Sequence, residues 1–341
     1  MNLRPVVLLT AALLLSGCGA GGVTTTSSGK NTTLDIAFSA SPIDLTGIAA
    51  SYAADIAYDS HERNTFDIFL PQASQPTGLI VYVHGGGFTS GDKSVIYQSE
   101  RAGEIQAALA QGAAFATINY RLLDTVDADG VIKPMGDSRR ALQFIRYHAD
   151  RLNIDSSRIA MYGDSAGAGT SLWLAFHDDM ADPVNPDPVL RQSTRIATAG
   201  AIEAQASYDI YRWESDVFID YRLTVDAMRD ASTILSQRLL SFYGVSDTEG
   251  LLSDEVTAYR RDVDLLGLLS VDDPKFWLKN SEQAEAFPQS ATQLLHHPFH
   301  ARELKEQADA IGIMNVSYIP AIGVSDPSQE EVVPFLLRQI Q

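Results

Sequence analysis

Apolar and polar positions along this chain form a series of short segments that alternate between strand and helix patterns. The run Leu79–Val83 is apolar throughout, as is typical of a strand buried on both faces of a sheet. The expected strands lie at 65–70, 79–83, 114–118, 158–162, 196–202 and 316–319, and the expected helices at 95–111, 137–153, 165–177, 298–311 and from 332 onward. This alternation predicts an α/β fold with a mostly parallel wound sheet and flanking helices.

One long segment, at about 208–286, departs from this alternation. Its spacing is helical, it is rich in aromatic residues, and it holds no clear strand. We expect a helical insertion over the carboxyl ends of the strands, where wound sheets bind ligands. The alternative is that these aromatic residues only form the core of a helical subdomain.

The first residues of the chain predict export. A charged start, an apolar run at 6–15 and small residues form a signal peptide over residues 1–17. Cys18 is the only cysteine, and the residues before it resemble a bacterial lipobox, which implies that its thiol carries a lipid. Gly19 after it resembles the sorting signal of lipoproteins that leave the inner membrane. An outer-membrane lipoprotein of the cell envelope is therefore expected.

Composition supports one globular domain behind a tether. Residues 19–33 are rich in glycine, serine and threonine, so a flexible tether is expected over 18–45, which leaves 46–341 as the folded domain. The chain is 45% hydrophobic and 20% charged, as globular proteins are. Its net charge of -18 disfavours nucleic acid as a partner and leaves the lipid anchor as the expected membrane contact. Otherwise this charge predicts only a soluble surface, and the oligomeric state stays open.

A candidate nucleophile stands between a predicted strand and a predicted helix, in the run Gly163-Asp164-Ser165-Ala166-Gly167. A serine on a strained strand-to-helix turn needs neighbours without side chains, and the following helix N-terminus favours the negative charge of an acyl-transfer intermediate. Ser165 is therefore the predicted nucleophile. The alternative is an ordinary strand-turn-helix junction.

A second motif directly follows the apolar strand at 79–83, in the run His84-Gly85-Gly86-Gly87. A glycine-rich loop at this place can present backbone N–H groups to an oxyanion. We predict the donors to be the amides of Gly86, Gly87 and Ala166, with His84 supporting the loop. The alternative for the glycines is a flexible turn.

Together these motifs resemble the hormone-sensitive-lipase and carboxylesterase group. The run Gly91-Asp92-Lys93-Ser94 beside them is similar to the bacterial feruloyl and acetylxylan esterase-like relatives. The resemblance covers roughly Tyr58–Gln341. It implies an α/β-hydrolase fold and a serine hydrolase of small carboxylic esters that needs no metal or organic cofactor.

The resemblance fails at two positions of the catalytic triad. The family's histidine is expected just after the last strand, where this chain has Val324 and Ser325. The family's acid is expected before the helix at 298, where Gln293 offers an amide. Valine cannot move a proton, and an amide lacks the negative charge of a carboxylate.

Other histidines and carboxylates can replace the missing groups. The cluster of His296, His297 and His300 occupies a loop expected at the rim of the site, and His297 is the first choice as general base. Helix capping and surface packing are the alternative for this cluster. A zinc site is disfavoured because no carboxylate or cysteine completes it. The replacement acids to consider are Glu203, Asp164 and Asp326.

Two functions follow from these patterns. The first is a carboxylic-ester hydrolase in which Ser165 attacks and a histidine of the cluster moves the proton. The second is a catalytically degenerate member that keeps the pocket and acts as a binding protein of the cell envelope. Weak ester hydrolysis does not distinguish the two, because the oxyanion loop alone retains weak catalysis. Activation of Ser165 does distinguish them.

Overall fold

The computed structural model describes residues 32–341, apart from 125–126, 231–232, 248, 284–286 and 289. The signal peptide and Cys18 lie outside the described residues, so cleavage and lipidation stay predictions. Within these ranges no helix is long and apolar enough to cross a bilayer.

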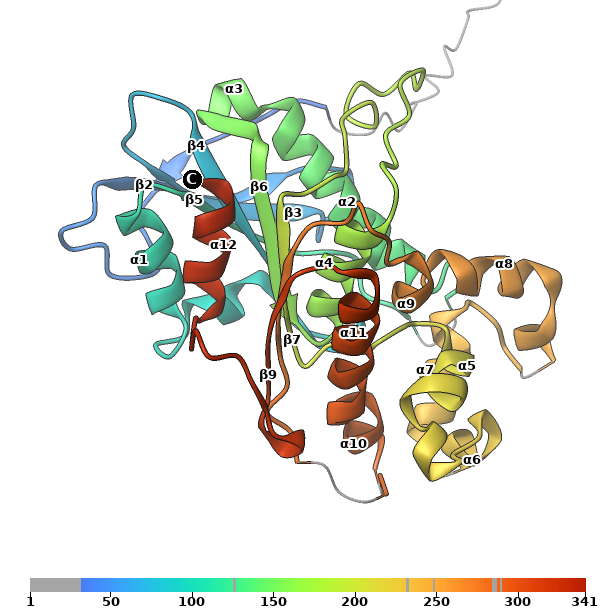
Figure 1. Cartoon of the computed structure of the whole chain (residues 1–341). Helices are drawn as coiled ribbons and strands as arrows, with labels where there is room; N and C mark the ends of the chain where they lie inside the picture. The colour runs from blue at the N-terminus through green and yellow to red at the C-terminus, as the bar shows by residue number, and fades with distance from the viewer. Residues whose placement is uncertain (1–31, 125–126, 231–232, 248, 284–286, 289) are drawn as a thin grey trace, which may run out of the picture.

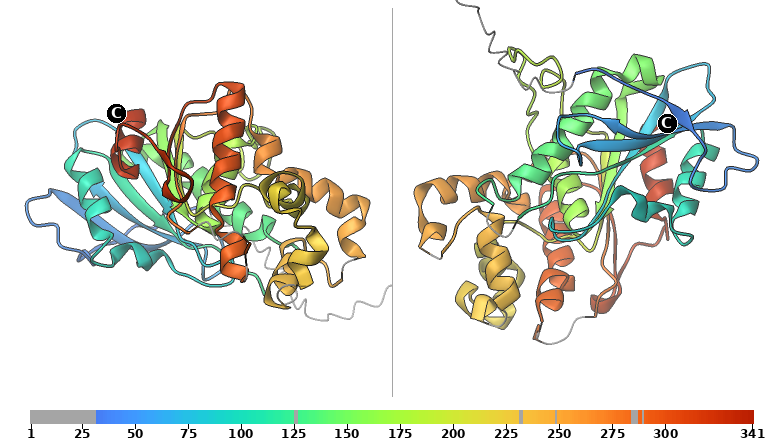
Figure 2. Two further views of the ribbon diagram at one scale, coloured as in Figure 1. Left: turned by 60° about the horizontal axis from the view of Figure 1, so that its bottom comes forward. Right: turned by 180° about the vertical axis from the view of Figure 1, so that it is seen from behind.

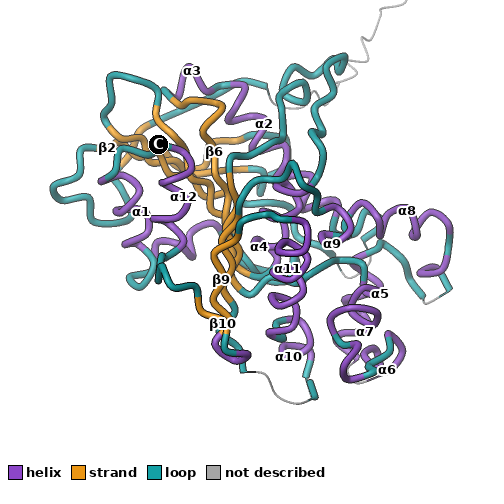
Figure 3. The backbone as a smooth tube through the Cα atoms, viewed as in Figure 1, coloured by secondary structure: helices purple, strands orange, loops and turns teal. Residues whose placement is uncertain are grey.

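A single sheet runs through the described part of the chain, drawn in orange in Figure 3. Its strand order is β1-β2-β3-β5-β4-β6-β7-β8-β9-β10. The strands are β1 (Phe38–Ser39), β2 (Ala50–Ala57), β3 (Thr65–Pro71), β4 (Thr77–Val83), β5 (Ala114–Ile118), β6 (Ile154–Asp164), β7 (Thr198–Ile202), β8 (Phe276–Lys279), β9 (Asn315–Ile319) and β10 (Val324–Ser325). Strands β5, β4, β6, β7, β8 and β9 are parallel, and the pairs beyond them are antiparallel. The predicted α/β fold with a mostly parallel sheet is therefore confirmed.

Helices cover both faces of this sheet, as Figures 1 and 2 show. They are α1 (Ala102–Ala110), α2 (Ile132–Tyr147), α3 (Ala149–Leu152), α4 (Ala166–Phe176), α5 (Ile210–Arg212), α6 (Val225–Asp230), α7 (Thr233–Phe242), α8 (Asp254–Asp262), α9 (Leu265–Leu268), α10 (Ala291–Leu295), α11 (Pro298–Ile311) and α12 (Val332–Ile340). Shorter turns are η1 (Lys93–Tyr97), η2 (Trp213–Val217), η3 (Ile219–Tyr221), η4 (Gly250–Leu252) and η5 (Pro320–Ile322). Side chains of α1 and α12 pack on one face, and those of α2, α4 and α11 on the other. All seven residues of β4 are buried as a result, which explains their apolar run.

The predicted insertion is helical, but it ends earlier than expected. Elements α5 to α9 lie together at one end of the molecule, beside α11 in Figure 1. Strand β8 lies inside the range 208–286, where no strand was expected, and pairs in parallel with both β7 and β9. It was missed because it has only four residues and ends on the charged Lys279.

The N-terminal boundary of the domain also differs from the prediction. Leu34 is 3% exposed and belongs to the core, and β1 pairs with β2. Residues 34–45 are therefore part of the folded domain, and the predicted tether over 18–45 is too long. Helix α2 also begins earlier than predicted, at Ile132 instead of at Asp137.

Candidate active site

Ser165 lies on the tight turn between β6 and α4. Its backbone has φ +49° and ψ -114°, in the left-handed half of the map that residues with side chains rarely adopt. A Cβ on Gly163 would lie 2.3 Å from the Val83 carbonyl oxygen, and one on Gly167 would lie 2.0 Å from the same oxygen. The two glycines thus let the turn approach β4 and hold the serine in a strained conformation.

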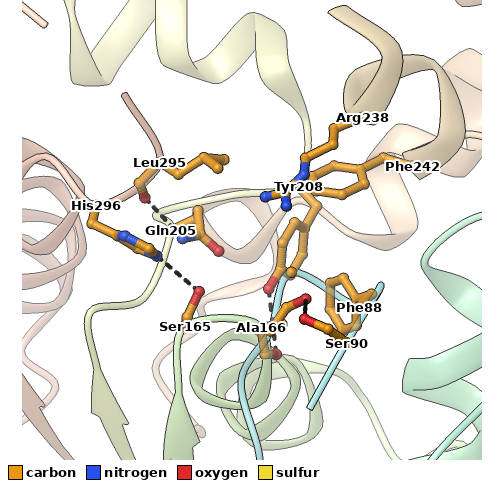
Figure 4. A pocket seen from close by; sticks show the side chains of 12 residues that line it. Phe88, Ser90, Ser165, Ala166, Gln205, Tyr208, Arg238, Phe242, Leu295 and His296 are labelled. Atoms are coloured by element: carbon orange, nitrogen blue, oxygen red, sulfur yellow. Dashed lines mark hydrogen bonds between the residues drawn. The ribbon is translucent and has the colours of Figure 1, made fainter. Parts of the chain in front are cut away.

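The glycine loop after β4 packs directly against this turn. A Cβ on Gly85 would lie 3.5 Å from the Ser165 Cβ. Gly86 and Gly87 have φ values of +111° and +60°, and the Gly86 carbonyl accepts hydrogen bonds from two later amides of the loop. Together with Ser165 and Ala166 they line one cavity of about 240 Å³. The three predicted oxyanion donors therefore line the same pocket as the predicted nucleophile. Figure 4 shows Ser165 and Ala166 in this pocket.

His84 holds this loop in place. Its ring stacks on Tyr120 with a centroid distance of 4.2 Å, and its Nδ1 donates a 2.7 Å hydrogen bond to the Gly85 carbonyl. Burial lowers the pKa of His84 to about 4, so the ring is neutral and its other nitrogen can accept from Arg63, 3.4 Å away. His84 therefore supports the loop from behind, without entering the cavity lining.

The histidine that meets the nucleophile is His296. Its Nε2 lies 2.9 Å from Ser165 Oγ, so the hydroxyl can donate to the ring, as Figure 4 shows. The prediction that His297 would fill this place is wrong. Pro298 opens α11, which makes His297 the N-cap, and its Nδ1 accepts a hydrogen bond from the Phe299 amide. Pro298 directly after His297 is the signal in the sequence that could have identified His297 as a helix cap.

Buried side chains fix the backbone around His296. The carbonyls of residues 294–296 each accept one such hydrogen bond: Leu294 from His300 (2.9 Å), Leu295 from Gln205 (2.8 Å) and His296 from Asn280 (3.0 Å). The His300 ring is fully buried, and burial lowers its pKa to about 3. It is therefore neutral and acts on the backbone. These three contacts hold His296 in register with Ser165.

The electrostatic surroundings keep His296 neutral. Burial lowers its pKa most; the charge of Glu282 raises it, Arg238 lowers it further, and the net shift is downward. Among the described residues, no carboxylate hydrogen bonds to the second ring nitrogen. A neutral imidazole can accept the Ser165 proton, which is what a general base requires.

Comparison with known proteins places this arrangement in a family. The model of the family described as BD-FAE matches residues 66–281, which is more than half of the chain. This chain belongs to the BD-FAE family. The match runs from β3 through the glycine loop and Ser165 to the residue after Asn280.

Curated relatives of this BD-FAE protein align over short stretches. Acetylcholinesterase of Gallus gallus is 33% identical over 116 residues, which cover 31% of this chain and 14% of that protein. Chlorogenic acid esterase of Aspergillus niger is 29% identical over 106 residues, which cover 30% of this chain and 20% of that protein. The aligned stretch therefore spans a fifth or less of these two relatives.

Solved structures share the fold at lower identity. A truncated carbohydrate esterase from gut microbiota superposes with a TM-score of 0.56 at 16% identity, over 79% of this chain and 88% of that one. Esterase B from Lactobacillus rhamnosis gives a TM-score of 0.55 at 15% identity, over 85% and 86%. The BD-FAE protein thus has the α/β-hydrolase fold that the resemblance implied.

The position at which the family carries the acid of its catalytic triad is not that of Gln293. Because β8 is the strand before α11, the residues after it are Asn280 to Glu282, whereas Gln293 belongs to α10. Glu282 is exposed and follows a turn in which its amide donates to the Asn280 side chain. Without β8, sequence reasoning could not assign this position.

The three replacement acids proposed from sequence are engaged away from His296. Asp164 accepts hydrogen bonds from the Tyr82 hydroxyl and from Arg101. Glu203 accepts from the Ser281 amide at 2.7 Å, and burial raises its pKa to about 7. Asp326 accepts from the amide two residues later, in the loop before α12.

The position at which the family carries the histidine of its catalytic triad lies in a short strand of this chain. Val324 and Ser325 form β10, which pairs antiparallel with the end of β9. In this BD-FAE member the histidine at the serine therefore comes from the segment between β8 and β9. Among the described residues, no cluster of three or more His, Cys, Asp or Glu side chains could hold a metal ion.

Proposed function

We propose that this BD-FAE protein is a serine-dependent carboxylic-ester hydrolase with Ser165 as nucleophile and His296 as general base. The observation that carries the proposal is the 2.9 Å contact between Ser165 Oγ and His296 Nε2 beside the glycine loop. A serine hydroxyl is a poor nucleophile at neutral pH unless a base takes its proton. The depressed pKa of His296 supplies that base in its neutral form.

The reaction follows from these positions. Ser165 Oγ attacks the ester carbonyl while His296 takes its proton, and the amides of Gly86, Gly87 and Ala166 receive the negative charge of the tetrahedral intermediate. Collapse of the intermediate breaks the ester C–O bond, and the His296 proton passes to the leaving alcohol. Water then attacks the acyl-enzyme with His296 again as base, which releases the acid and restores Ser165.

The substrates we propose are small esters. The cavity of about 240 Å³ is lined by Phe88, Tyr208, Phe242 and Leu295 as well as by the reacting groups, so it offers an apolar wall to one part of the ester. The chlorogenic acid esterase and carbohydrate esterase among the similar proteins support an ester of this general kind.

Attachment to the cell envelope is part of the proposal. The signal peptide pattern over 1–17 and the lone Cys18 support a mature protein that begins at a lipidated cysteine. Mass analysis of the detergent-extracted protein tests this. A chain that starts upstream of Cys18, or an unmodified thiol, contradicts it.

Activation of Ser165 is tested with a fluorophosphonate probe and short-chain aryl esters. The wild-type protein should be labelled and should hydrolyse the esters, and Ser165→Ala should lose the label and fall by about 10³-fold or more in kcat. Ser157→Ala, a change at an exposed serine near the start of β6, should leave labelling intact.

A degenerate binding protein is the second candidate. It is favoured by the absence, among the described residues, of a carboxylate hydrogen bonded to His296. A wild-type protein that is folded but not labelled at Ser165 would establish this candidate and contradict the hydrolase.

A further inference from the structure

Arg238 places a positive charge inside the cavity of Ser165. It lies on α7 of the helical insertion and lines the cavity with Phe242 from the same helix. Its Nη1 lies only 3.1 Å from where a Cβ of Gly87 would be, so the guanidinium occupies the space beside the oxyanion loop that a side chain would fill. Figure 4 shows the guanidinium end directed toward the middle of the pocket, near Tyr208 and Gln205.

This charge has no carboxylate partner among the described residues. Two other arginines of the insertion that are not exposed form ion pairs, Arg229 with Asp226 and Arg260 with Asp209. Arg238 forms no such pair although it is half-buried and the chain carries a net charge of -18. Holding an arginine partly out of water without a counter-charge is unfavourable, unless a ligand supplies the anion.

The charge acts on the reacting groups as well. Arg238 is one of the groups that lower the pKa of His296, so the guanidinium and the imidazole share the same cavity. When an ester carbonyl lies at Ser165, the rest of a small substrate occupies the space between the oxyanion loop and α7. A guanidinium presents a planar fork of N–H donors that matches a carboxylate, and it stays charged at every working pH.

We propose that the preferred substrates are esters that carry a free carboxylate, which Arg238 binds while the ester carbonyl lies at Ser165. This inference rests on the proposed hydrolase function and specifies its substrate class. Phe88, Tyr208 and Phe242 then pack against the apolar part of the substrate that joins the ester to the carboxylate.

Two matched pairs of esters test the proposal by kinetics. The first pair, mono-(4-nitrophenyl) glutarate and 4-nitrophenyl valerate, differs by a carboxylate on the acyl side. The second, 4-acetoxybenzoate and its methyl ester, differs by a carboxylate on the alcohol side. In at least one pair, kcat/KM of the wild-type protein should favour the charged ester by about 10- to 100-fold, as a hydrogen bond between charged groups provides.

Variants connect this preference to Arg238. Arg238→Gln should reduce the ratio of the two kcat/KM values to near one, and Arg238→Lys should keep part of it, because a single ammonium retains the charge but loses the fork. The matched control is Arg261→Gln, an exposed arginine at the end of α8, which should leave the ratio unchanged. A ratio near one in the wild-type protein for both pairs, or a preference that survives in Arg238→Gln, overturns the proposal.

Binding to Ser165→Ala separates this proposal from the hydrolase itself. Calorimetric titration of this variant with the two 4-acetoxybenzoate compounds and the two nitrophenyl esters measures affinity without turnover. Tighter binding of a charged ester, lost when Arg238→Gln is added, supports the carboxylate site even if fluorophosphonate labelling of the wild type fails. Equal binding of both members in both pairs overturns the site even if the wild type hydrolyses neutral esters.

Discussion

The side chain of Asn280 donates a 3.0 Å hydrogen bond to the backbone carbonyl of His296, and this side chain is fully buried. Asn280 follows β8 directly, so the sheet and the proposed general base His296 are joined through one amide. The geometry at Ser165 therefore depends on a residue that touches no reacting atom.

Removing this amide should impair catalysis more than binding. Asn280→Ala leaves the His296 carbonyl without its donor, so the ring loses its alignment with Ser165 and kcat should fall by about tenfold or more, with a smaller change in KM. Aryl ester kinetics and a thermal melt measure the two effects. Asn185→Ala removes an asparagine hydrogen bond in a distant surface loop and should leave kcat unchanged. A folded Asn280→Ala protein with wild-type kcat contradicts a positioning role.

Neighbouring histidines provide a direct test of the assignment of the base. His296→Ala should lower kcat by about 10²- to 10⁴-fold, the range that general acid–base catalysis contributes. His297→Ala removes an N-cap and should instead lower the free energy of unfolding by about 1 kcal/mol. Ester kinetics combined with urea unfolding distinguish these outcomes. Loss of activity in His297→Ala at unchanged stability would show that the wrong histidine has been assigned.

The pH dependence of hydrolysis should report the charges around His296. Activity needs the neutral ring, and because burial lowers the pKa of His296, kcat/KM should rise with pH and level off below the usual histidine value of about 6.5. Arg238→Gln removes a charge that lowers this pKa, so the acid limb should move to higher pH. Glu282→Gln removes a charge that raises the pKa and should move the limb to lower pH. Shifts in the same direction for both variants contradict the arrangement.

Glu203 should make stability depend on pH. Burial raises its pKa from 4.5 to about 7, so the folded protein holds a proton that the unfolded chain has lost between these values. Folding stability therefore decreases as pH rises through this window. Glu203→Gln removes this titration and keeps an oxygen that can accept from the Ser281 amide. The free energy of unfolding of the variant should therefore exceed that of the wild type by about 1 kcal/mol, a value discounted for solvent screening.

Urea unfolding of the two proteins at several pH values measures this difference. Below about pH 4 both should have nearly the same free energy of unfolding, since Glu203 is then largely protonated in the folded and in the unfolded chain. The gain should reach its full size above pH 7. A difference that is constant across this range means that burial of the Glu203 carboxyl does not shift its titration.

The sequence predicted the central strands and the loops that leave them, because those features are local. The apolar run of β4 indicates a buried strand, and the glycines at 163 and 167 indicate a tight turn; each pattern lies within a few residues. His296 could not be told from His297 by spacing alone, since both lie between α10 and α11 and only the capping position before Pro298 separates them. Strand β8 is defined by its neighbours β7 and β9, which no pattern within four residues shows.

The helical insertion supplies Arg238 and Phe242, whereas Ser165, His296 and the glycine loop belong to segments that leave the sheet. In the proposed mechanism, reactivity and selectivity thus come from two separable parts of one chain. For the same reason, grafting the insertion of another esterase onto this scaffold offers a route to new substrate preferences without redesign of the nucleophile.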